Sequence, residues 1–110
     1  MEDYSFSFPQ GSLTSGRIVF RADNVGQVDH ELTLVALPKN LPGTLDQQLH
    51  SETRRAVLPL TILPARGPGR SGFFSIDLSP GRYGFVCFVT NPGDDESHAL
   101  KGMNAELTVE

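Results

Sequence analysis

Short alternations of apolar and polar residues, separated by glycine and proline, most limit how this 110-residue chain can fold. Residues 4–8 alternate aromatic side chains with serine, and residues 104–110 alternate apolar with polar side chains. A period of two places every second side chain on one face of a β-strand. Eleven glycines and eight prolines favour tight turns between short strands over long helices. The chain is therefore expected to be mostly β.

The same alternation places about seven short strands along the chain. They are expected over residues 4–8, 17–22, 30–36, 58–64, 73–78, 83–89 and 104–110. Prolines interrupt 58–64, which fits an edge strand or a packed loop, and an exposed loop is expected at 65–70. About seven strands predict an all-β Greek-key sandwich, and the length suits one domain over residues 1–110.

One short amphipathic helix is expected within residues 43–57. Thr44 can cap it, and Gln47 completes a capping box three residues later. Leu45 and Leu49 lie four residues apart and would share the apolar face. His50 would then be an exposed residue of this helix.

Charge and hydropathy exclude two broad classes of function. The formal net charge is −4, and the only basic doublet is Arg54-Arg55, so no stripe of lysine and arginine is available to bind nucleic acid. No apolar run approaches the roughly 18 residues needed to cross a bilayer. Met1-Glu2-Asp3-Tyr4 is acidic, so no signal peptide is evident at the beginning of this sequence.

Four side chains with soft or imidazole donor atoms are the candidate metal ligands. A single cysteine, Cys87, excludes an internal disulfide. It lies at the end of a predicted strand and is followed within one loop by His98 and Met103, while His30 begins a strand far upstream. Two imidazoles and a thiolate with a weak axial thioether suit copper in both of its oxidation states.

Three motifs surround these residues. Residues 24–32 combine Asn-x-Gly with His30, residues 78–87 combine a Pro-Gly turn with Tyr-x-Phe-x-Cys, and residues 98–103 run from a histidine to Gly-Met. In this order the motifs resemble the cupredoxin family, the plastocyanin- and azurin-like blue copper proteins. The resemblance spans residues 17–109, with a variable middle at 38–70.

The resemblance implies a mononuclear copper protein that carries one electron. It implies His30, Cys87, His98 and Met103 as the copper ligands, and the solvent-facing edge of His98 as the electron port. Pro92, Ala99 and Leu100 would form an apolar rim around that edge. We also expect a monomer without enzymatic activity, a redox partner protein that is basic at its docking face, and an extracytoplasmic location.

The loop before His98 departs from the family pattern. Ten residues separate Cys87 from His98, more than in familiar members, although a subgroup of bacterial plastocyanin-like proteins resembles this spacing. The extra segment must turn back if His98 is to reach the site. It carries Asp94, Asp95 and Glu96, which are either a solvated loop or a patch that steers a basic partner.

Other interpretations of the same residues stay open. Cys87 can be a small core residue, Met103 can fill the core, and His30 can be a polar residue where a strand begins. A cysteine hydrolase would use Cys87 and His98, although Cys87 lies within an apolar strand that offers no basic surroundings to activate it. A domain without a redox role, serving as a copper carrier or interaction module, is a further alternative. Zinc fits the set less well, because structural zinc prefers thiolate and imidazole to thioether.

Overall fold

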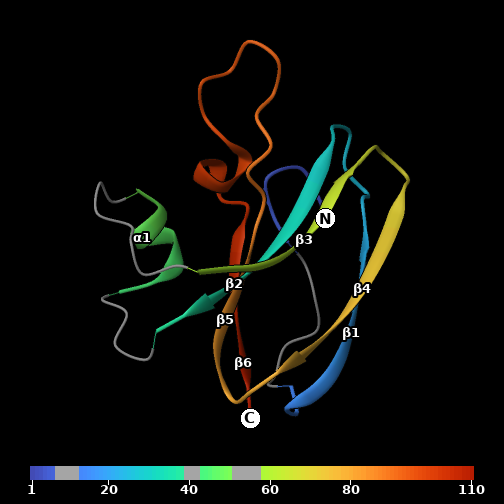
Figure 1. Ribbon diagram of the computed structural model, residues 1–110. Helices are drawn as coiled ribbons and strands as arrows, with labels where there is room; N and C mark the ends of the chain where they lie inside the picture. The colour runs from blue at the N-terminus through green and yellow to red at the C-terminus, as the bar shows by residue number, and fades with distance from the viewer. Residues whose placement is uncertain (7–12, 39–42, 51–57) are drawn as a thin grey trace.

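The computed structural model of the chain describes residues 1–6, 13–38, 43–50 and 58–110. Within these residues, six strands form two antiparallel sheets (Figure 1). A two-stranded sheet has the order β1-β4, and a four-stranded sheet has the order β3-β2-β5-β6. The strands are β1 (Gly16–Asp23), β2 (His30–Leu37), β3 (Leu58–Arg66), β4 (Ser71–Leu78), β5 (Gly81–Val86) and β6 (Asn104–Val109). The predicted β-sandwich is confirmed.

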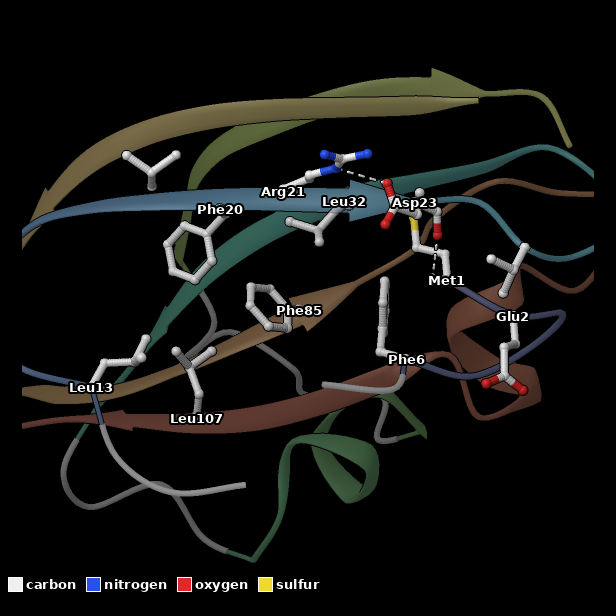
Figure 2. Close-up of a pocket in the computed structure, with 13 residues that line it drawn as sticks. Met1, Glu2, Phe6, Leu13, Phe20, Arg21, Asp23, Leu32, Phe85 and Leu107 are labelled. Atoms are coloured by element: carbon white, nitrogen blue, oxygen red, sulfur yellow. Dashed lines mark hydrogen bonds and ion pairs between the residues drawn. The ribbon is translucent and has the colours of Figure 1, made fainter. Parts of the chain in front are cut away.

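The main core lies between the two sheets because alternate side chains of each strand point inward. Leu32 and Leu34 of β2 are buried there, as is Phe85 of β5. Phe20 of β1 packs edge-on against Phe85, with ring centroids 5.5 Å apart. Figure 2 shows these rings beside a cavity of about 510 Å³ whose described lining is mainly apolar.

A second cluster lies on the outer face of the four-stranded sheet. The helix α1 (Leu45–His50) buries Leu45 and Leu49 against Val35 and Val86. The predicted capping box is present: the Gln47 amide donates to Thr44 Oγ1 over 3.2 Å, and the Thr44 amide donates to Gln47 Oε1 over 2.9 Å. These contacts begin the helix and attach it to the sheet.

The predicted N-terminal strand differs from the structure. Residues 1–6 form a turn, in which the Glu2 and Ser5 backbones pair with each other. Tyr4 has a φ of 68°, in the left-handed region, which ends any extended strand at that residue. The rest of the predicted strand lies outside the described residues, as do the helix expectation over 51–57 and the doublet Arg54-Arg55.

The predicted metal ligands lie at the end of the sandwich where several loops meet. The loop from β5 to β6 projects from this end, at the top of Figure 1. It contains the 3-10 helix η1 (His98–Lys101), which the sequence did not predict. Conversely, β3 continues to Arg66, two residues into the segment predicted as a loop. Among the described helices, none has both the length and the apolar character needed to span a membrane.

Candidate metal centre

Three of the four predicted ligands converge at this end of the sandwich. His30 is the first residue of β2, Cys87 directly follows β5, and His98 is the first residue of η1. One donor atom from each of the three lies within 4.8 Å of the others. All three side chains are fully buried. The cluster therefore combines the residue types and the spacing that a metal ion requires.

The turn before His30 is fixed by the side chain of Asn24, which is almost fully buried. Its Nδ2 donates to the carbonyl oxygens of Val28 (2.8 Å) and Arg66 (2.7 Å). Its Oδ1 accepts the amide of Gly26 at 2.9 Å. One amide side chain thus ties the turn to the end of β3, and this holds the start of β2 and with it His30.

Cys87 is held between strand β5, which precedes it, and the backbone of Met103. Its backbone amide donates to the carbonyl of Met103 over 3.1 Å. Its Sγ accepts a hydrogen bond from the amide of Glu31, at 3.4 Å. Burial raises the pKa of the Cys87 thiol, so without a metal ion the sulfur is protonated at neutral pH. A buried thiol with a raised pKa is a poor nucleophile, which weighs against the cysteine hydrolase.

The long loop does return His98 to Cys87. Thr90 and Ser97 form an isolated antiparallel bridge, and the His98 amide donates to the carbonyl of Val89 over 2.8 Å. The acidic segment turns inside this bridge, where Lys101 Nζ lies 2.9 Å from Asp94 Oδ2 and 4.0 Å from Glu96 Oε1. Part of the acidic cluster therefore has an internal structural role.

The outer nitrogens of both histidines have acceptors. His30 Nε2 lies 2.8 Å from Asp3 Oδ1, and His98 Nε2 lies 2.8 Å from Asn91 Oδ1. The hydrogen bond from His30 is the largest influence that lowers the pKa of Asp3, so this carboxylate is ionised and can only accept. In its neutral form, each imidazole therefore carries its proton on Nε2.

The inner nitrogens then present lone pairs. His30 Nδ1 lies 3.1 Å from His98 Nδ1, and His98 Nδ1 lies 3.6 Å from Cys87 Sγ. Burial and the neighbouring His30 lower the pKa of His98, which favours the neutral ring. Two convergent imidazole lone pairs and a thiol in a dry site suit a soft cation, so the donor set fits copper.

Comparison with known proteins identifies the fold. No family model matches the sequence, and no curated protein matches it. The structure is similar to the crystal structure of dithionite-reduced auracyanin from the photosynthetic bacterium Roseiflexus castenholzii, with a TM-score of 0.65 and 19% identity over 99% of this chain and 90% of that chain. Auracyanin is a cupredoxin. The chain has the cupredoxin fold. The resemblance inferred from three sequence motifs is thus confirmed.

Within this cupredoxin fold, backbone hydrogen bonds join Met103 to Cys87 and His98. Met103 is fully buried, and its amide donates to the carbonyl of His98 over 3.0 Å. Gly102 precedes it with a φ of 108°, a left-handed conformation that ends η1 and turns the chain toward β6. Met103 also belongs to the core between the sheets. Both predicted roles, axial ligand and core residue, are compatible with this position.

The predicted electron port is wrong for this cupredoxin fold. His98 is fully buried and has no solvent-facing edge. The ring of Tyr4 packs edge-on against it, with centroids 5.2 Å apart, and Asn91 binds its outer nitrogen. Asn91 Nδ2 also donates to Tyr4 Oη over 2.9 Å, which links the two covering residues. The predicted rim of Pro92, Ala99 and Leu100 has no exposed His98 edge to surround, and Ala99 is itself fully buried.

The structure adds contacts that the sequence did not reveal. Asp3 and Tyr4 come from the N-terminal turn, and Asn91 comes from the polar loop. His50 lies on α1 and is exposed, as predicted, but its Nε2 also lies 3.2 Å from the carbonyl oxygen of Leu100 in η1. The cavity of Figure 2 is separate, because none of the candidate ligands lines it.

Proposed function

We propose that this protein, as a single domain over residues 1–110, is a one-electron carrier that holds one copper ion between His30, Cys87, His98 and Met103. Copper bound there would supply the redox chemistry by alternating between Cu(II) and Cu(I). The observation that carries the proposal is the convergence of His30, Cys87 and His98 donor atoms within 4.8 Å in a buried site.

Each residue has a separate task in this proposal. His30 and His98 would offer Nδ1 lone pairs, because Asp3 and Asn91 accept the protons on Nε2. Cys87 would hold the metal as a thiolate, which favours Cu(I). Met103 would contribute a weak thioether interaction. The difference between strong and weak donors makes both oxidation states accessible.

The scaffold restricts the motion of these donor atoms and shields them from solvent. His30 begins β2 and Cys87 directly follows β5, and these are the two central strands of the four-stranded sheet. Backbone hydrogen bonds join Met103 to both Cys87 and His98. Full burial of all four side chains excludes water from the cluster. A ligand set that moves little lowers the reorganisation required for electron transfer.

Several observations support a redox partner rather than a bound substrate. The similar auracyanin structure is of the dithionite-reduced protein, which supports redox work for this fold. Asp95 and Glu96 are exposed on the loop that leads to His98, which favours a partner that is basic at its docking face. We propose that the protein acts as a monomer outside the cytoplasm, as such carriers do.

A reductive titration tests this function. The copper-loaded protein should take up one electron per copper from dithionite and return to its oxidised spectrum when an oxidant is added. Cys87→Ser provides the control, because serine keeps the size of the side chain without a thiolate. Copper that binds but does not cycle reversibly would exclude the electron carrier.

The covered His98 edge favours one second candidate, a copper-carrying or interaction module without a redox role. Tyr4 and Asn91 both lie between His98 and the outside, so a docked protein cannot contact His98 directly. Electron self-exchange between oxidised and reduced molecules separates the two functions. Rapid exchange supports the carrier, whereas exchange that is slow in the wild type and accelerated in Tyr4→Ala supports the module.

A further inference from the structure

The N-terminal turn, defined here as residues 1–6, contributes a carboxylate to the histidine cluster. Asp3 Oδ1 lies 2.8 Å from His30 Nε2. The same carboxylate accepts the Gln27 amide at 3.0 and 3.1 Å and the Val28 amide at 3.4 Å. Asp3 thus joins His30 to the turn that precedes it.

The backbone holds Asp3 in this place at a conformational cost. The Val25 amide donates to the Met1 carbonyl over 2.8 Å, and Glu2 and Ser5 pair through hydrogen bonds of 3.0 and 3.3 Å. Between them, Tyr4 adopts a φ of 68°, the only positive φ of a non-glycine residue in the described part of the chain. Such strain is typical of segments with a functional role.

We propose that Asp3 is a positioning residue of the copper centre, which keeps the His30 proton on Nε2 and, through its negative charge, favours Cu(II) over Cu(I). The effect on the two copper oxidation states rests on the proposed function, whereas the effect on the His30 tautomer does not. An ionised carboxylate can only accept a hydrogen bond, so it fixes the tautomer of the ring beside it. Metal-binding histidines commonly use their second nitrogen in this way.

The charge of Asp3 makes the two histidines unequal. His30 faces a carboxylate, whereas His98 faces the neutral amide of Asn91. A nearby negative charge stabilises the doubly charged ion more than the singly charged one. His30 is fully buried, whereas the Asp3 side chain is 34% exposed, so solvent screens part of the charge.

Two substitutions separate the hydrogen bond from the charge. Asp3→Asn keeps an acceptor oxygen but removes the charge, and Asp3→Ala removes both. Glu2→Gln is the matched control, because Glu2 is an exposed acid in the same turn, and its only described hydrogen bonds are made by the backbone.

The tautomer is measured on the metal-free protein. Long-range 1H–15N correlation spectra, recorded about two units above the ordinary histidine pKa, should show His30 as the Nε2–H form in the wild type and in Glu2→Gln. Asp3→Ala should give a mixture of both tautomers. A pure Nε2–H form in a folded Asp3→Ala protein would overturn the positioning role, whether or not the protein binds copper.

The charge effect is measured as a reduction potential. Asp3→Asn should lower the ratio of Cu(II) to Cu(I) affinity about tenfold, which raises a one-electron potential by about 59 mV. Glu2→Gln should change the reduction potential far less. Equal potentials in Asp3→Asn and Glu2→Gln would overturn the charge effect. A wild type that binds no copper would overturn the proposed function and this charge effect with it, and the tautomer spectra would still decide the positioning role.

Discussion

His30 Nδ1 and His98 Nδ1 face each other at 3.1 Å, although the two histidines lie 68 positions apart in the chain. When both rings are neutral, both inner nitrogens present lone pairs, because Asp3 and Asn91 accept the single ring protons on the outer nitrogens. Two lone pairs at this distance repel unless a proton or a metal ion lies between them. The cluster is therefore arranged for a cation, and Cys87 makes a soft one the better fit.

Copper binding is expected to release about one proton from Cys87 at neutral pH. Burial raises the pKa of this thiol, so the proton is still present before the metal arrives. The apparent copper affinity should accordingly increase with pH. Calorimetric titrations in buffers of different ionisation enthalpy measure the proton count. Cys87→Ser should release none, and an equal release from both proteins would contradict ligation by the thiolate.

Asn24→Ala should reduce the free energy of unfolding by about 1–3 kcal/mol. The substitution leaves the Val28 and Arg66 carbonyls and the Gly26 amide without their side-chain partner. Copper affinity should fall as well, because the same turn places His30. Denaturant unfolding and copper titration measure the two effects. Gln27→Ala, an exposed amide in that turn, should change neither; equal losses in both variants would refute the role given to Asn24.

Much of the fold, and the convergence of His30, Cys87 and His98, could be predicted from sequence because local patterns encode them. The strand alternation, the Thr44–Gln47 capping box and the turn before His30 each depend on residues close together in the chain. The cover over His98 depends instead on Tyr4 and Asn91, which are 87 residues apart. The alternation of aromatic residues over 4–8 predicts a strand and carries no signal for the turn at Tyr4. The contact between Tyr4 and Asn91 therefore could not be predicted from the sequence.

Gly84→Ala should destabilise the protein by about 1–3 kcal/mol through overpacking. An added Cβ would lie 2.5 Å from Leu45 Cδ2 and 3.0 Å from the carbonyl oxygen of Ala105, so the buried Leu45 side chain would have to move. Gly81→Ala on the same strand is the control, since its nearest neighbour would be a Tyr83 ring atom at 3.7 Å. Thermal unfolding measures both, and similar midpoints would show that α1 is not closely packed.

His50 should make stability depend on pH. Hydrogen bonds to the carbonyls of Asp46 and Leu100 raise its pKa in the folded protein. A raised pKa contributes stability that is fully present below the ordinary value of about 6.5 and is lost as the pH rises through the folded value. Thermal midpoints measured across this range should fall more steeply for the wild type than for His50→Gln. Parallel curves would contradict this role of His50.

The visible spectrum after addition of one equivalent of Cu(II) tests the central claim most directly. We predict an intense thiolate-to-copper charge-transfer band in the wild type and its complete loss in Cys87→Ser. A colourless wild type, or a band that persists in Cys87→Ser, would contradict a copper centre built on His30, Cys87 and His98.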